Sequence, residues 1–226
     1  MPLVDPVVAV YARITQVLDD FLLNHVLAGE GLNDLEDFED VRIGGNGRIP
    51  LERDASVTAN AHVLEVLQVV PPFPRQHVIQ QKVLKYLRDA RVDGDHWVDK
   101  WHGSPFYATA HAVFALTASA PDACLPAFKW FSKTQREDGS WGWFNQGTPE
   151  ETAYAVQALM LAPAAFRAEI KEQLRRAAAY LHETEGEPVI PMWVGKTLYG
   201  PTQVVRSAVL SAQILLARSE HARPAD

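Results

Sequence analysis

A short motif recurs at the start of four segments of this chain, and this repeat limits the fold more than any other feature. The segments start at Thr58, Thr109, Thr152 and Val205, at intervals of 51, 43 and 53 residues. The first three open with a Thr-Ala pair followed by more alanines and apolar residues, and the fourth is a weaker copy. A period of roughly 40–50 residues is typical of repeat architectures. Because alanine lets helices approach closely, we expect these segments to be the inner helices of a ring.

Longer amphipathic segments alternate with the repeated ones. Residues 75–91, 126–133 and 166–183 carry Lys and Arg on one side and apolar residues on the other, as helices on the outside of a core do. Residues 6–26 also have apolar residues at helical spacing. No strand-like alternation of useful length occurs in the sequence. The predicted fold class is therefore all-α, an α/α toroid or partial α/α barrel of about eight helices.

Composition narrows the class of protein. The chain has 226 residues, of which 47% are hydrophobic, and this suits one domain, 1–226, with a substantial core. A net charge of −7 argues against nucleic acid as the main partner. The single cysteine, Cys124, excludes an internal disulfide and a cysteine-rich zinc site, and it fits a reducing, cytoplasmic setting. We find no signal peptide and no apolar run long enough to span a bilayer.

The segment 128–159 contains the sharpest local motif. An aromatic helix end is followed by Gln135, then by Gly139 and Trp141, and then by a new helix. Gly139 would supply the tight turn that stops the first helix. The amide of Gln135 can bridge the helix end and the turn, and Trp141 and Trp143 are expected to stack back on that helix.

This arrangement resembles the QW motif of squalene–hopene cyclases and related class II terpene cyclases, which have prenyltransferase-like α/α barrels. Two other turns look like degraded QW repeats. One ends at Trp97, with Arg91 in the place of the glutamine, and the other ends at Trp193. The resemblance covers about residues 53–216 and implies a stand-alone version of the catalytic β domain. The segment 27–50, rich in glycine and acids, is expected to be a long loop, and residues 219–226 a frayed tail.

The resemblance also implies a proton donor in the pattern Asp-x-Asp-Asp-Thr-Ala, whose middle aspartate protonates an alkene or epoxide in that family. Asp54, Thr58 and Ala59 match the pattern, but Ser56 and Val57 stand where two of the three aspartates belong. A serine hydroxyl cannot protonate an alkene. Either another acid has taken the role, or the domain no longer performs the reaction.

Three carboxylic acids near the predicted starts of inner helices are candidate catalytic residues. Asp54 precedes the first repeated helix, and Glu150 and Glu151 precede the third. Each has a structural alternative. Asp54 can cap the helix that follows it, and the two glutamates can interact favourably with a helix dipole. Both interpretations remain open for each residue.

Aromatic and cationic residues concentrate near the expected rim of the barrel. Aromatic faces stabilise cations and suit an isoprenoid, and Lys or Arg can pair with a diphosphate. Alternatively, Trp193 plugs the barrel and Lys196 caps a helix. His62 and His111 occupy similar repeat positions and could meet as a general base, with Asn60 nearby. The candidate substrate-binding residues are Trp97, Trp101, Phe106, Tyr107, His111, Tyr154, Trp193, Lys196, Tyr199 and Arg206.

One acidic stretch is a candidate Mg²⁺ site, and Mg²⁺ is the only cofactor that the sequence indicates. Glu36, Asp37 and Asp40 form a Glu-Asp-x-x-Asp pattern that resembles the diphosphate/Mg²⁺ motif of some class II diterpene cyclases. Mg²⁺ prefers oxygen ligands and often shares them with phosphates. The alternative is an ordinary acidic surface loop.

The sequence therefore leaves two functional hypotheses. The first is a noncanonical class II-type terpene cyclase that starts cyclisation of an isoprenoid or prenyl diphosphate by protonation in an aromatic-lined cavity. The second is a catalytically degenerate isoprenoid-binding protein or partner subunit of a cyclase. A single barrel with an open site also suggests a homodimer or a partner cyclase, and an apolar substrate would suit peripheral contact with a membrane.

Overall fold

The computed structural model describes residues 55–221, with side chains up to residue 219. The helix expected over 6–26, the loop over 27–50 and the end of the tail lie outside this range. Two short strands and one 3-10 turn accompany eight α-helices in the described part. The elements are α2 (Val57–Val69), α3 (Gln76–Asp89), α4 (Pro105–Ser119), η3 (Pro121–Cys124), α5 (Leu125–Thr134), α6 (Pro149–Met160), α7 (Ala164–Glu169), α8 (Lys171–Glu183), β1 (Trp193–Val194), β2 (Leu198–Tyr199) and α9 (Thr202–His221).

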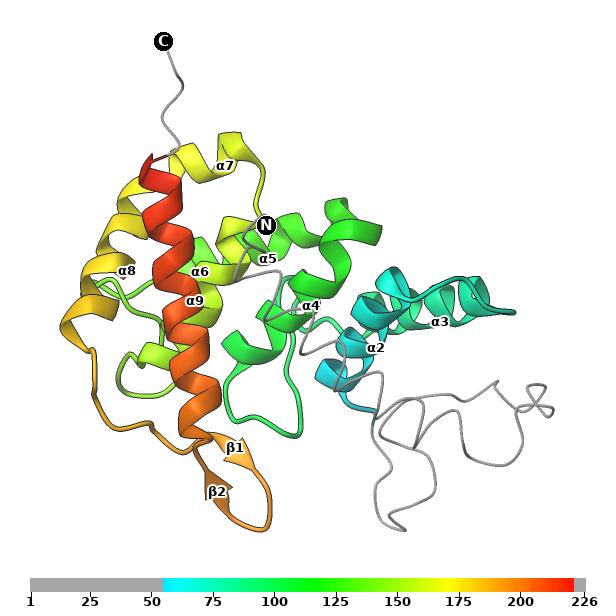
Figure 1. Ribbon diagram of the computed structural model, residues 1–226, viewed down its shortest axis with the longest axis horizontal. Coiled ribbons are helices and arrows are strands. Elements are labelled where there is room, and N and C mark those ends of the chain that lie inside the picture. The colour runs from blue at the N-terminus through cyan, green and yellow to red at the C-terminus, as the bar shows by residue number, and fades with distance from the viewer. Residues whose placement is uncertain (1–54, 222–226) are drawn as a thin grey trace, which may run out of the picture.

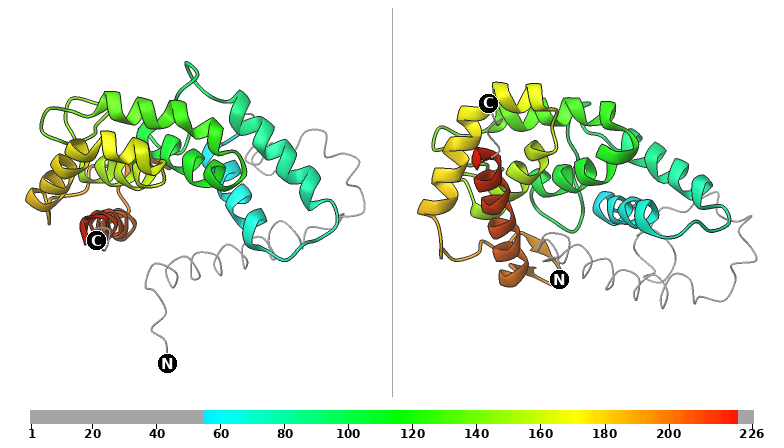
Figure 2. Two further views of the ribbon diagram at one scale, coloured as in Figure 1. Left: turned by 90° about the horizontal axis from the view of Figure 1, so that it is seen from above. Right: turned by 45° about the horizontal axis from the view of Figure 1, so that its top comes forward.

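The helices form two layers, as the repeat predicts. The inner layer is a row in which α2 packs on α4, α4 on α6 and α6 on α9. The outer helix α3 covers α2, α5 lies against α4 and α6, and α8 lies against α6 and α9. Helices α2 and α9 stand at opposite ends of the row (Figures 1 and 2). The described helices therefore form an arc of an α/α toroid, which confirms the predicted fold class.

The two layers differ in sequence as their burial requires. The alanines of α4 and α6 lie in the interior, and Ala110 and Ala155 have no exposed surface. By contrast, α3 and α8 bury one stripe each, which on α8 consists of Leu174, Ala177 and Leu181. A helix with one apolar stripe covers a core, whereas a helix that is apolar all round lies within it. No helix in the range 55–221 has both the length and the apolar character needed to cross a bilayer.

The glutamine–tryptophan turn has the geometry that its sequence predicts. Gln135 Nε2 donates to the carbonyl of Gly139 at 2.9 Å and to that of Gln173, on α8, at 2.8 Å. Trp141 is fully buried, and its Nε1 donates to the carbonyl of Phe131 on α5 at 2.8 Å. The turn therefore ties together α5, α8 and the loop that leads to α6.

The repeated threonine has a specific role in these turns. The backbone N–H of Trp141 donates to Thr152 Oγ1 at 3.0 Å, and that of Trp97 donates to Thr109 Oγ1 at 2.9 Å. Each tryptophan is thus fixed to the inner helix that follows it. In the first copy, Trp97 Nε1 donates to the Leu87 carbonyl at 2.6 Å.

Some local expectations need correction. Trp143 is 50% exposed and does not pack fully against α5. The helix expected over 166–183 is divided into α7 and α8, with the break at Ile170. Trp193 lies in the β1–β2 hairpin, and its indole reaches α6 instead of the preceding outer helix. The third turn therefore does not repeat the contact made by Trp97 and Trp141.

A substitution at Gly139 tests how tightly the turn is built. Gly139 has φ +88°, and a Cβ there would lie 2.6 Å from the carbonyl oxygen of Arg176. Gly94, in the first copy of the turn, has φ +80° with nothing within 4 Å. Both alanine variants adopt an unfavourable left-handed conformation, which costs about 1–2 kcal/mol. We expect Gly139→Ala to lower the free energy of unfolding by at least about 1 kcal/mol more than Gly94→Ala, because only Gly139 is overpacked.

Urea denaturation followed by circular dichroism measures both variants. Equal losses of stability for Gly139→Ala and Gly94→Ala would contradict the close approach of α8 to this turn.

Candidate functional site

The starts of the inner helices carry a connected set of buried and half-buried polar groups, which we term the polar rim. Ser56, Ser104 and Thr148 are the N-caps of α2, α4 and α6, and each side chain accepts a backbone N–H of its helix. Such caps satisfy donors that a helix leaves unpaired. Around them lie acceptors that come from the loops and from α6. The polar rim consists of Ser56, Thr58, Asp99, His102, Ser104, Thr148, Glu150 and Glu151.

The start of α2, where the resemblance places the proton donor, is occupied by a hydroxyl–carboxylate network. Ser56 Oγ donates to Asp99 Oδ1 at 2.8 Å, and Thr58 Oγ1 donates to Asp99 Oδ2 at 3.0 Å. The backbone N–H of Trp101 also donates to Asp99 Oδ2, at 3.1 Å. Asp99 is therefore held as an acceptor that joins this loop to α2. Asp54 lies outside the described residues.

Sequence reasoning did not find Asp99. Its only local signal is its position two residues after the buried Trp97, in the loop that leads to α4. Its partners Ser56 and Thr58 lie more than 40 residues earlier, 43 and 41 positions away. That separation leaves no pattern in the sequence that links the carboxylate to the hydroxyls.

Glu151 is an anchor between α4 and α6. Its Oε1 accepts from Ser104 Oγ at 2.5 Å and from the backbone N–H of Trp143 at 2.9 Å, and its Oε2 accepts from Thr148 Oγ1 at 2.8 Å. Burial raises the pKa of the Glu151 carboxyl, and these hydrogen bonds act in the opposite direction. Both oxygens therefore already have protein donors, which leaves the group little room to meet a substrate.

Glu150 differs from Glu151 in the hydrogen bonds that its carboxyl oxygens accept. Its side chain is 3% exposed, and its Oε1 accepts from Trp193 Nε1 at 2.8 Å. His102 Nδ1 accepts the N–H of Ser104 at 3.0 Å, so the His102 proton lies on Nε2, which faces Glu150 Oε1 at 3.4 Å. The other carboxyl oxygen, Oε2, is buried and has no hydrogen-bond partner. Glu150 is therefore a buried acid with one oxygen uncommitted.

A cavity of about 390 Å³ adjoins Glu150. Its walls are the start of α6, residues 184–190 and one side of α9, including Arg206 and Val209. None of the aromatic residues predicted to bind substrate lines this cavity. The cavity therefore brings together an acid and an exposed cation, and the aromatic residues lie elsewhere.

His102 and Trp193, which face Glu150 Oε1, belong to a larger cluster of rings. His102 stacks on Tyr107 with ring centroids 4.2 Å apart, and Tyr107 lies 4.9 Å from Trp193 and 5.0 Å from Tyr154. His111 lies 4.5 Å from Tyr107. Burial raises the pKa of both tyrosines, so their phenols are neutral at pH 7. The aromatic cluster consists of His102, Tyr107, His111, Tyr154 and Trp193.

The remaining predicted site residues are dispersed. Trp97 and Phe106 lie in the core, at 0% and 2% exposure, which leaves them no surface for a substrate. Trp101 and Tyr199 are partly exposed at 40% and 47%. Two basic side chains are exposed, Lys196 between β1 and β2 and Arg206 on α9, and Glu36, Asp37 and Asp40 lie outside the described residues.

His62 and His111 meet, as their repeat positions suggest. Their ring centroids are 4.7 Å apart in an edge-on arrangement. His62 Nδ1 also lies 3.0 Å from Glu65 Oε2. The amide of Asn60 instead donates to the carbonyl of Ser56, within α2. The sequence thus located the histidine pair, but Glu65 is an additional partner that it did not indicate.

Comparisons with known proteins give consistent matches. A family model described as the squalene-hopene cyclase C-terminal domain matches residues 50–200. The chain is 39% identical over 166 residues to a type B diterpene cyclase of Mycobacterium tuberculosis, and 41% identical over 182 residues to a copalyl diphosphate synthase of Streptomyces anulatus. These matches cover 73% and 75% of the chain but 33% and 32% of the relatives. The chain therefore spans about a third of the length of these relatives.

A solved structure agrees with this result. The chain matches ent-copalyl diphosphate synthase from Streptomyces platensis with a TM-score of 0.65 and 36% identity, over 74% of this chain and 34% of that protein. The double layer of helices is thus found in a related structure as well as in the repeat pattern.

Proposed function

Because the chain belongs to the squalene–hopene cyclase C-terminal domain family, we propose that it forms part of a class II-type terpene cyclase site, with Glu150 as the acid. The reaction would begin with protonation of a carbon–carbon double bond in a prenyl substrate. The observation that carries this proposal is the buried Glu150 carboxyl, whose Oε1 faces Trp193 and His102 of the aromatic cluster and whose Oε2 has no hydrogen-bond partner.

The surroundings of Glu150 suit a proton donor. Its Oε2 accepts from no protein donor, so this oxygen is the one free to meet a substrate. Proton transfer forms a C–H bond on the substrate, leaves a carbocation and converts Glu150 to a carboxylate. The N–H groups of Trp193 and His102, which already face Oε1, would stabilise the charge that develops on Glu150.

The aromatic cluster suits the carbocation that this proton transfer would leave. The faces of Trp and Tyr attract cations within about 6 Å of the ring centroid. Trp193 is half-buried and donates to Glu150 Oε1, so its neutral ring can stabilise a carbocation without trapping it as a base would, and the buried Tyr107 packs 4.9 Å from it. Neither ring contributes to the wall of the cavity of about 390 Å³.

A prenyl diphosphate is the substrate class that we favour, since two of the relatives are named copalyl diphosphate synthases. Arg206, in the cavity wall near Glu150, and Lys196 of the hairpin are the basic residues that we propose for the diphosphate. Glu36, Asp37 and Asp40 remain the proposed Mg²⁺ ligands. Because the chain spans about a third of its relatives, we expect another domain, a second copy or a partner chain to close the site.

A product assay tests this function directly. The purified chain is incubated with geranyl, farnesyl and geranylgeranyl diphosphates and with squalene, in the presence of Mg²⁺, and the products are identified by mass spectrometry. We expect a cyclised product from at least one prenyl diphosphate. Absence of any product, together with absence of binding of the same compounds by calorimetry, would contradict the proposal.

The second candidate is a catalytically degenerate isoprenoid-binding protein or partner subunit. One observation favours it. Ser56 stands where the family's donor aspartate belongs, and it is used as the cap of α2 and as a donor to Asp99. Binding of a prenyl diphosphate without any turnover, in the same calorimetric and product assays, would select this candidate.

A further inference from the structure

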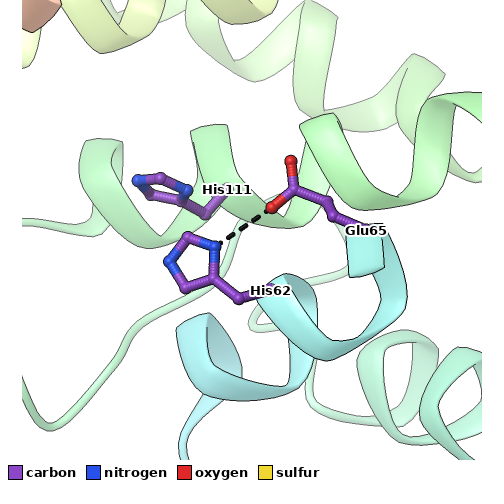
Figure 3. Close-up of side chains that lie close together, drawn as sticks. All are labelled: His62, Glu65 and His111. Carbon is purple, nitrogen blue, oxygen red and sulfur yellow. Dashed lines mark hydrogen bonds and ion pairs between the residues drawn. The ribbon is translucent and has the colours of Figure 1, made fainter. Parts of the chain in front are cut away.

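Two inner helices bring three metal-ligating side chains together, apart from the Glu150 carboxyl. His62 and Glu65 lie on α2, about one helical turn apart, and His111 lies on α4, which packs against α2 (Figure 3). One ligand atom from each of the three lies within 4.8 Å of the other two. Within residues 55–221, no other group of three His, Cys, Asp or Glu side chains has this proximity.

His111 is the side chain that most needs a partner. Both of its ring nitrogens are buried, and neither has a hydrogen-bond partner. A buried polar group without a partner is unfavourable, so its presence requires a reason. Neither nitrogen is engaged by the protein, so the ring can offer a lone pair to a metal ion.

His62 and Glu65 form the other half of the group. His62 Nδ1 and Glu65 Oε2 are 3.0 Å apart, and the two side chains are 35% and 26% exposed. This partial exposure gives an ion a path to the group from solvent. The Glu65 carboxylate also supplies a negative charge next to the two imidazoles, which compensates part of the charge of a divalent cation.

We propose that His62, Glu65 and His111 bind one divalent transition-metal ion, for which Zn²⁺ is the reference. Two imidazoles and one carboxylate favour such ions over Mg²⁺ and Ca²⁺, which prefer oxygen ligands. Three protein ligands leave a fourth position for water, as in many open zinc sites. This inference does not depend on the proposed cyclase function, because it concerns the contact between α2 and α4.

The distances are close to those that a tetrahedral ion requires. Zn²⁺ binds nitrogen and carboxylate oxygen at about 2.0–2.2 Å, so neighbouring ligand atoms stand roughly 3.4 Å apart. The His62–Glu65 distance of 3.0 Å is already near this value. Atoms up to 4.8 Å apart need to approach by roughly 1.4 Å, a movement within reach of side-chain rotation. Binding would then join the first two inner helices of the arc.

Metal titration without any substrate tests the site. The full chain is treated with a chelator, dialysed and titrated with Zn²⁺ by calorimetry, and thermal unfolding is measured with and without the ion. We expect Zn²⁺ to bind and to raise Tm, because an ion that binds only the folded chain stabilises it by mass action. Titration with Co²⁺ provides a spectroscopic signature, since its visible absorption reports tetrahedral coordination by nitrogen and oxygen.

Two variants and one control assign the ligands. Glu65→Gln keeps the shape of the side chain but removes its charge, and His111→Phe keeps a ring within the aromatic cluster. We expect each to weaken Zn²⁺ binding by at least about tenfold and to reduce the rise in Tm, since loss of a ligand costs at least as much as loss of a ligand's supporting group. His77→Ala removes an exposed histidine from α3 and is the matched control, with unchanged binding.

Circular dichroism checks that each variant remains folded. Absence of Zn²⁺ binding by the unsubstituted chain would overturn the proposal. Binding that is equal in Glu65→Gln, His111→Phe and the unsubstituted chain would overturn it as well, because the ion would then lie elsewhere. Neither result bears on the product assay, so failure of the metal site and failure of the cyclase function remain distinguishable.

Discussion

Glu150→Gln is expected to reduce the formation of cyclised product by about 10²- to 10⁴-fold, the contribution typical of a positioned general acid. Glutamine keeps the size of the side chain and an oxygen that can accept from Trp193 and His102, but it has no acidic proton. The rate is measured with the prenyl diphosphate that gives product in the assay above. Binding of that substrate is expected to change far less than the rate, because the shape of the site is retained.

Glu151→Gln is the matched control for this experiment. Glu151 adjoins Glu150 in the sequence and is also buried, but both of its oxygens accept hydrogen bonds from Ser104, Trp143 and Thr148. Its amide variant is expected to lose stability while each folded molecule retains most of its activity. A variant Glu150→Gln with full activity would remove Glu150 as the acid. Loss of product in Asp54→Asn together with such a result would assign the acid to Asp54.

Trp141→Ala is expected to lower the free energy of unfolding by about 3–5 kcal/mol, as is usual when a large aromatic side chain is removed from a core. Trp141 is fully buried and also donates through Nε1 to the carbonyl of Phe131, which would be left without this partner. The variant removes the side chain that links α5 to the turn before α6. Urea denaturation followed by circular dichroism or fluorescence measures the loss.

Trp143→Ala provides the comparison, since Trp143 lies two residues away and is 50% exposed. We expect it to lower the free energy of unfolding by less than about 1 kcal/mol, as surface substitutions usually do. Similar losses for the two variants would mean that the turn does not depend on the burial of Trp141.

Local features of the fold were accessible from the sequence because their partners are close along the chain. Trp141 reaches a carbonyl 10 residues earlier and a threonine 11 residues later, and the first copy repeats these contacts with Trp97, Leu87 and Thr109. A recurring sequence motif could therefore predict a recurring turn and, from it, the double layer of helices. The sequence did not predict the division between α7 and α8, because the apolar pattern continues through Ile170 although the helix does not.

The candidate site could be predicted only in part from the sequence, because the partners of its side chains lie far apart along the chain. Glu150 and Glu151 are the same residue type at the start of the same helix, and no property of the sequence separates their roles. They differ because Glu151 meets donors at the start of α4 and in the loop before α6, whereas Glu150 meets Trp193 and His102 and keeps one oxygen unpartnered. Likewise, Trp97 and Phe106 are aromatic residues near the expected rim, but packing against the outer helices places them in the core.

The repeat and its alanines, the tryptophan turns and the family were thus contained in the sequence, since they depend on spacing along the chain and on the residues that fill a helix interface. The tertiary structure decided which carboxyl has a free oxygen, that Asp99 joins Ser56 and Thr58, and that Glu65 joins two histidines on neighbouring helices. The physical reason is that the state of a buried polar group depends on the donors and acceptors around it. Those partners come from segments that only the packing of the inner helices brings together.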